Sequence, residues 1–181
     1  MLREHLRDSK GFTLVEVMVV VTIIGLIVIP IYDIYLRGWQ ANTKTFRQTN
    51  AQDVAVKVME EICDGFTNNG VRVEGLRGAG AVTYDSTGYN RFAYLAGTSV
   101  VSYYLNAGVL YRNVQPYSGS VVINGTGGVQ VAGNVKNFMV KSDNGKLVSI
   151  TLEISQGSDA NTKSDITLAT KILPRNLVSG G

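Results

Sequence analysis

The chain has 181 residues, of which 45% are hydrophobic and 17% charged, and its formal net charge is +3. This composition predicts one globular domain with an appended apolar segment, and no cluster of basic and aromatic residues indicates a nucleic-acid surface. The only histidine is His5 and the only cysteine is Cys63, which excludes Ser-His-Asp, Cys-His and His/Cys zinc sites from the body of the chain. We therefore expect no enzyme, no catalytic residue and no cofactor, and we interpret Cys63 as a small buried hydrophobic residue.

The amino-terminal part of the chain consists of a polar leader, residues 1–11, and an apolar run, residues 12–32. About twenty apolar residues at 1.5 Å rise match a hydrocarbon core of roughly 30 Å, so the run predicts a single membrane span. The basic leader, with Lys10 at its end, favours a cytoplasmic N-terminus and places the rest of the chain outside. The small residue Gly11 precedes the apolar run, whereas the cleavage site of a secretory signal peptide follows it.

One carboxylate, Glu16, lies near the polar edge of this run. A charge at the centre of a membrane costs about 2.5–3.5 kcal/mol on insertion scales, and the cost falls toward the interface. Glu16 is therefore tolerable but needs a partner. Cleavage between Gly11 and Phe12 would create an α-amino group that is largely cationic at neutral pH. This amine could pair with Glu16 of a neighbouring copy or with Glu16 of the same chain.

The segment GFTLVE, residues 11–16, followed by a long apolar helix containing Gly25, resembles the class III leader of type IV pilins and type II secretion pseudopilins. The resemblance implies cleavage after Gly11 by a prepilin peptidase, N-methylation of Phe12, a role for Glu16 in assembly and bundling of helices into a filament. The alternative is a plain single-pass anchor with an incidental glutamate, which leaves the whole GFTLVE arrangement unexplained.

Beyond the membrane span, apolar residues recur at three- or four-residue spacing from Ile31 through Phe46 and Ala51 to Ile62. This spacing predicts that one helix continues as an amphipathic segment over residues 33–63. Pro30 removes a backbone donor and is expected to kink or loosen the helix, and Gly38 is a second weak point.

Residues 64–181 predict an antiparallel β-rich domain, with strands beginning at about Val71 after turn signals at residues 64–65 and 68–70. The clearest strand, residues 147–155, alternates apolar and polar residues and pairs with residues 135–142 through the turn Asp143-Asn144-Gly145. A second hairpin turns at residues 106–108, and a last strand covers residues 165–173. The expected fold class is α+β, with a long N-terminal helix packed on an antiparallel β-sheet domain.

Two segments of this domain, VSYYLNAGVLYRNV (residues 101–114) and TKILPRN (residues 170–176), resemble the minor pseudopilin J and minor pilin W group. The resemblance implies a low-copy subunit of the inner membrane that initiates assembly at the filament tip. Its partners would be other minor subunits, the major subunit, the assembly platform and membrane lipid. If the resemblance is coincidental, Leu110 and Tyr111 are the core and rim of a strand, and Arg112 and Arg175 are solvated charges.

Other candidate sites have weaker patterns. Asp159, Asn161 and Asp165 offer oxygen ligands, but an EF-hand loop would need Gly at position 164 and Glu at position 170, so we expect a polar loop and no metal site, with calcium left open. The pair Glu60 and Glu61 predicts a solvated face. Two further functions stay open. One is a competence or adhesive pilus subunit whose tip binds DNA or a surface, and the other is a membrane-anchored binding protein or enzyme with a prepilin-type leader.

Overall fold

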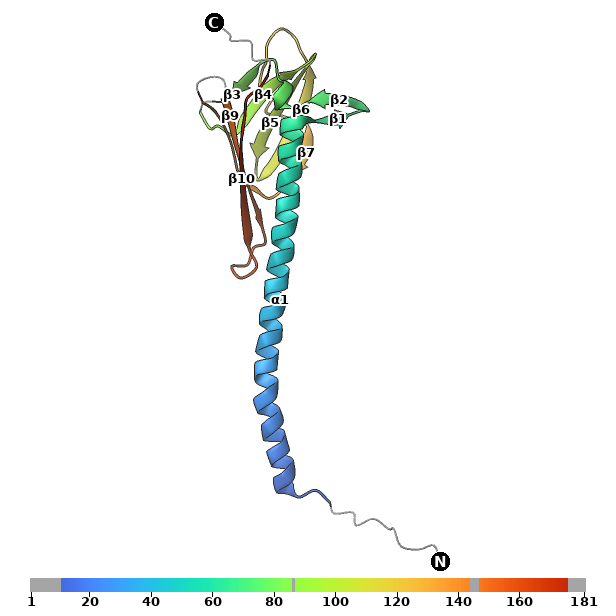
Figure 1. Cartoon of the computed structure of the whole chain (residues 1–181), viewed down its shortest axis with the longest axis vertical. Coiled ribbons are helices and arrows are strands. Elements are labelled where there is room, and N and C mark those ends of the chain that lie inside the picture. The colour runs from blue at the N-terminus through green and yellow to red at the C-terminus, as the bar shows by residue number, and fades with distance from the viewer. Residues whose placement is uncertain (1–10, 86, 144–146, 176–181) are drawn as a thin grey trace, which may run out of the picture. The chain divides into compact units, whose positions relative to one another are not determined.

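The computed structural model describes residues 11–85, 87–143 and 147–175. The chain forms two compact units, residues 1–42 and residues 43–181. One helix, α1 (Leu14–Asp64), contributes to both units, and every strand belongs to the second unit (Figure 1). The predicted α+β fold, a long N-terminal helix with antiparallel sheets, is confirmed. Lys10 and the rest of the leader before Gly11 lie outside the described residues.

The described part of the first unit is the amino-terminal portion of α1 and the three residues before it. The helix begins at Leu14 because Thr13 caps it: the Glu16 N–H donates to Thr13 Oγ1 (3.3 Å), and the Val17 N–H donates to the Thr13 carbonyl oxygen (3.2 Å). α1 continues through Pro30, and the bend expected there and at Gly38 stays a prediction. The large apolar side chains between Leu14 and Ile29 are 47–77% exposed, so this surface requires a cover of lipid or other helices.

In the second unit, α1 packs on the sheets through one stripe. Ala51 and Ala55 are fully buried, and their small side chains let the helix backbone approach the strands closely. The buried residues of the stripe are Ala51, Ala55, Val58, Met59, Ile62 and Cys63. The predicted amphipathic spacing is confirmed from Ala51 onward. It is wrong for Phe46, which is 74% exposed because the buried stripe of the second unit does not extend that far.

A two-stranded hairpin, β1 (Gly65–Asn68) and β2 (Val71–Glu74), follows α1 directly (Figure 1). Its turn residues Asn69 and Gly70 have φ angles of 50° and 78°, which confirms the predicted turn. The predicted start of the sheet near Val71 is wrong, because Gly65 already begins a strand. At φ 97°, Gly65 lets the chain pass from helix to strand without an intervening loop.

A five-stranded antiparallel sheet follows, in the order β3-β4-β5-β6-β7. The predicted hairpin is its centre: Asn106 pairs with Val109, and Ala107 and Gly108 adopt positive φ angles of 47° and 77°. A single 3₁₀ turn, η1 (Leu76–Gly78), precedes the sheet. The strands are β3 (Val82–Tyr84), β4 (Arg91–Ala96), β5 (Ser99–Asn106), β6 (Val109–Pro116) and β7 (Val129–Ala132).

The third sheet has the order β10-β9-β8 and consists of β8 (Val135–Asp143), β9 (Leu147–Gln156) and β10 (Ser164–Ile172). The predicted pairing of β8 with β9 is confirmed, although the turn residues Asn144 and Gly145 lie outside the described residues. The predicted alternation of β9 is also confirmed, since every second residue from Val148 to Ile154 is buried.

The three sheets and the α1 stripe share one hydrophobic core. Phe92 on β4 joins the two larger sheets: its ring centroid lies 5.5 Å from that of Tyr103 on β5 and 6.0 Å from that of Phe138 on β8. Ring pairs at these separations contribute about 0.5–1.5 kcal/mol each beyond their buried area. The core therefore fixes the last turns of α1 against a rigid aromatic layer.

Candidate functional site

The predicted processing segment lies immediately before α1. Gly11, Phe12 and Thr13 are outside the helix, and the Phe12 side chain is 80% exposed. A peptidase needs an extended, accessible peptide bond, because a helical segment hides its backbone in internal hydrogen bonds. The bond between Gly11 and Phe12 lies outside the helix, and both residues are exposed.

Glu16 lies in the first turn of α1, where a carboxylate interacts favourably with the helix dipole. Thr13 and Glu16 have the T-x-x-E spacing of a capping box, and the bond from the Glu16 N–H to Thr13 Oγ1 is one half of that motif. This local role of Glu16 was not predicted, although the T-x-x-E spacing indicates it. Glu16 thus contributes to helix initiation through its backbone, independently of any role for its carboxylate.

Gly25 lies in the middle of the apolar part of α1. Apart from the helix's own neighbouring backbone, no described atom lies within 4 Å of the position that a Cβ atom on Gly25 would occupy. Steric crowding by other described atoms of the same chain therefore does not explain why residue 25 is a glycine. An unfilled glycine notch on an apolar helix is the feature that lets a second helix approach closely.

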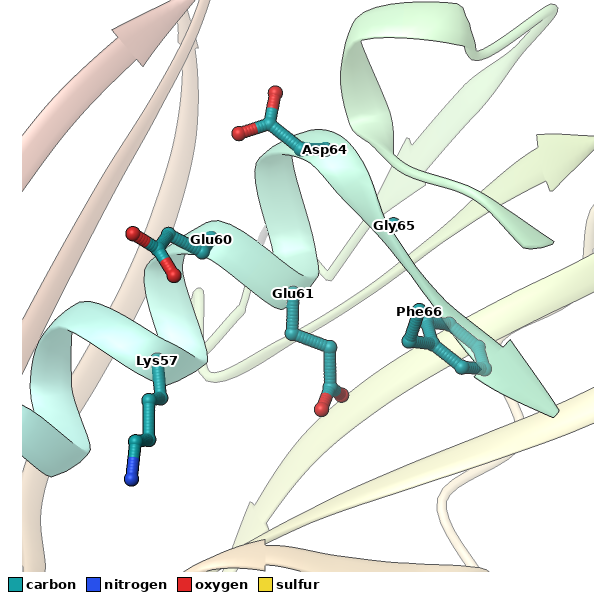
Figure 2. Close-up of a pocket in the computed structure, with 6 residues that line it drawn as sticks. All are labelled: Lys57, Glu60, Glu61, Asp64, Gly65 and Phe66. Carbon is teal, nitrogen blue, oxygen red and sulfur yellow. The ribbon is translucent and has the colours of Figure 1, made fainter. Parts of the chain in front are cut away.

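A second group of interacting side chains lies where α1 ends on the five-stranded sheet. Glu61 Oε1 of α1 forms an ion pair with Arg112 Nη1 (2.6 Å) and accepts a hydrogen bond from the Tyr103 hydroxyl (3.0 Å). The guanidinium of Arg112 lies over the Phe66 ring, 3.6 Å from its centroid. Figure 2 shows Glu61 and Phe66 projecting from α1 and β1 toward the same region, whereas Glu60 and Asp64 project elsewhere. We call Glu61, Arg112, Tyr103 and Phe66 the Glu61–Arg112 network.

This network corrects one alternative and one prediction. The alternative of a solvated Arg112 is wrong, since only 12% of its side chain is exposed. The prediction that Glu61 is part of a solvated face is also wrong, since its side chain is 24% exposed. The register explains the position of Arg112: it pairs across the hairpin with the buried Tyr103 and therefore shares the core side of the sheet. Glu60, by contrast, is exposed as predicted.

Burial controls the protonation chemistry around the network. Burial raises the pKa of the Tyr103 hydroxyl well above its usual value, and the same cause raises the pKa of Tyr94. Cys63 is buried as predicted, and burial together with the neighbouring Asp64 carboxylate raises its pKa, so it is an inert thiol. Both tyrosine hydroxyls thus remain neutral at physiological pH.

A shallow groove of about 420 Å³ borders the network (Figure 2). Its charged lining residues are Lys57, Glu60, Glu61 and Asp64, and two of the three carboxylates already have cationic partners: Glu61 binds Arg112, and Asp64 Oδ1 lies 3.0 Å from Arg77 Nε. Among the described residues that line the groove, no nucleophile lies beside a general base.

The polar loop of the calcium alternative has internal partners. Asp165 Oδ2 lies 3.5 Å from Lys136 Nζ and 3.6 Å from Lys163 Nζ, and a hydrogen bond from the Ser155 hydroxyl is the main cause that lowers the pKa of Asp165. The Thr162 hydroxyl accepts a hydrogen bond from Arg47 Nη1 at 2.5 Å. Across the described residues, no three His, Cys, Asp or Glu side chains gather as a metal site would need.

Residues 6–32 match the family model described as the prokaryotic N-terminal methylation motif. The match covers Gly11, Phe12, Glu16 and the apolar part of α1. This motif is that of the class III prepilin leader, and it supports the type IV pilin and pseudopilin family for this chain. No curated protein and no solved structure matches the chain. Support for the family therefore comes from the leader and the apolar part of α1. By length and composition, α1 could cross a membrane.

Proposed function

We propose that this prepilin is a minor subunit of a type IV pilus or a type II secretion pseudopilus. A prepilin peptidase cleaves it after Gly11, and Phe12 is then N-methylated. Residues 12–32 hold the subunit in the inner membrane, with residues 64–181 on the outer side, until it enters the filament. The observation that supports this proposal is the GFTLVE motif placed directly before an apolar helix, with the cleavage bond outside the helix and accessible.

Extraction from the membrane exchanges lipid contacts of α1 for contacts with other helices. The exposed apolar side chains of the first unit supply this surface, and the notch at Gly25 permits close packing. Glu16 then pairs with the N-terminal amine of a neighbouring subunit, which replaces the interfacial water that solvates both charges. Entry of a subunit into the filament core therefore depends on charge pairing as well as on helix packing.

The low-copy, tip-located role is supported by the resemblance of residues 101–114 and 170–176 to the minor pseudopilin J and minor pilin W group. Its partners would be the other minor subunits, the major subunit and the inner-membrane assembly platform. The groove at the end of α1 has no catalytic arrangement, which favours a structural subunit over a membrane-anchored enzyme.

The decisive experiment is mass spectrometry of the N-terminal peptide from membrane-extracted protein. We expect a peptide beginning with N-methylated Phe12. A mature chain that still begins at Met1 would contradict the proposed processing.

A second arm tests assembly. We expect Glu16→Gln to be processed normally but to enter sheared filaments, or a membrane-extracted complex with the sister subunits, at least tenfold less than the wild-type chain. Thr13→Val is the matched control. It removes the side-chain cap, at a cost of about 1 kcal/mol of helix stability, but keeps the carboxylate and should still assemble. Equal incorporation of Glu16→Gln and the wild-type chain would refute the pairing.

A further inference from the structure

A basic recess lies at the end of the second unit where α1 and β10 both finish. It has a volume of about 320 Å³ and is lined by Arg77, Lys171, Ile172, Leu173 and Arg175. Its three cationic side chains come from three places in the chain: η1, β10 and the turn after β10. The hydrogen bond from the Arg175 N–H to the Arg77 carbonyl oxygen (3.0 Å) holds two of these places together. Among the described residues that line the recess, none is acidic.

An adjoining recess of about 340 Å³ shares Arg77 and Arg175 and adds Arg72. Its two carboxylates belong to Asp64 and Glu74, and Asp64 is engaged at the helix end: its carboxylate pairs with Arg77 Nε (3.0 Å), and its carbonyl oxygen accepts a hydrogen bond from Arg72 Nη2 (3.1 Å). The lining of the two recesses together has four basic and two acidic side chains. By contrast, the groove of Figure 2 is lined by three acidic residues and one basic residue.

The recess also has an apolar part. Leu173 is 63% exposed beside the cations, while its neighbour Ile172 is buried in the core. An exposed leucine among basic groups suits a ligand that offers carboxylates and an aliphatic side chain together. No aromatic residue is among the described residues that line the recess, so it lacks the stacking surface of a single-strand nucleic-acid groove.

We propose that this basic recess binds an acidic segment of a partner protein, with glutamate or aspartate carboxylates against Arg77, Lys171 and Arg175 and an aliphatic side chain against Leu173. Arg77 is held by its pair with Asp64 and forms the fixed side of the recess. Lys171 and Arg175 are exposed and present positively charged groups to an acidic segment.

The test uses the full-length chain in nonionic detergent micelles and a fluorescent octapeptide of sequence EELEELEE, with micelles alone as the blank. We expect saturable binding by fluorescence anisotropy at low salt, weakened when the salt concentration is raised because the charges are exposed. Lys171→Gln and Arg175→Gln should each weaken binding about fivefold, as expected for loss of one exposed charge pair. Leu173→Ser should weaken it by a similar factor.

Lys44→Gln is the matched control. It removes the same charge from an exposed site about 30 Å along α1 from Asp64, at 1.5 Å per residue, and should leave binding unchanged. Near-ultraviolet circular dichroism of every variant verifies that the aromatic core is intact. The proposal is overturned if the wild-type chain does not bind the peptide, or if Lys44→Gln weakens binding as much as Arg175→Gln. Tighter binding of a single-stranded decanucleotide than of the peptide also overturns it, as does self-association that fills the recess with a second copy.

Discussion

Removing Arg112 is expected to destabilise the second unit strongly, because the Glu61 carboxylate then loses its cationic partner. Breaking a buried ion pair by deleting one partner costs about 3–5 kcal/mol. The side chains here are 12% and 24% exposed, so water reaches part of the pair, and we expect about 2–3 kcal/mol for Arg112→Met. This value includes the lost contact with the Phe66 ring, for which about 0.5–2 kcal/mol is typical. With a urea m value of about 2 kcal/mol/M, the unfolding midpoint should fall by about 1–1.5 M.

The assay is urea unfolding of the full-length chain in nonionic detergent, followed by near-ultraviolet circular dichroism, because the stacked rings of Phe92, Tyr94 and Tyr103 report the core of the second unit. The double variant Glu61→Leu/Arg112→Met should recover most of the lost stability, because no unpaired charge remains. Lys163→Met breaks an exposed ion pair and should not shift the midpoint. A loss below about 0.5 kcal/mol for Arg112→Met, or a double variant equal to the sum of the single losses, would refute the reasoning.

Three further outcomes follow from the packing. Gly75→Ala should lower the urea midpoint by more than any exposed substitution, because its Cβ would collide with the backbone at the end of α1, whereas Gly80→Ala meets only ordinary contacts and should be tolerated. Since burial raises the pKa of Tyr94 and Tyr103, the contribution of these two residues to the free energy of unfolding should be constant below the unfolded tyrosine pKa of about 10 and fall as the pH rises above it. Tyrosinate absorbance of these two residues should then appear only together with unfolding. The buried Cys63 thiol should react with a thiol reagent only in urea, and rapid labelling of the folded chain would show that the helix end is open.

The long helix and the two main hairpins could be predicted because their signals are local. Apolar spacing gave the extent of α1, and an Asn-x-Gly turn fixed the register of β5 with β6. The position of Arg112 also followed from this register, since residues two apart lie on the same side of a strand and Leu110 was predicted to be in the core. The sequence-based alternative placed Arg112 in solvent because the side chain is charged, although the register indicates the core side of the strand. Its partner Glu61 could be identified only once the helix end was placed on that sheet.

The strand β1 and the exposure of Phe46 could not be predicted from local sequence signals. Asp64-Gly65 is a helix stop signal, and nothing local indicates that the same glycine begins a strand paired with β2. Phe46 continues the apolar spacing of α1, but the buried stripe of the second unit runs only from Ala51 to Cys63. Periodicity shows which face of a helix is apolar, whereas the length that is buried depends on the size of the partner surface.

The two roles of Glu16 can be separated because they use different atoms. The cap of α1 uses the Glu16 backbone N–H and the Thr13 hydroxyl, so any L-amino acid other than proline at position 16 can donate that bond. Assembly would use the carboxylate, which Glu16→Gln removes while it keeps the shape of the side chain and the backbone donor. Loss of assembly in Glu16→Gln therefore cannot be a consequence of a lost cap. Only the pairing of charges between an N-terminal amine and Glu16 predicts that Thr13→Val assembles and Glu16→Gln does not.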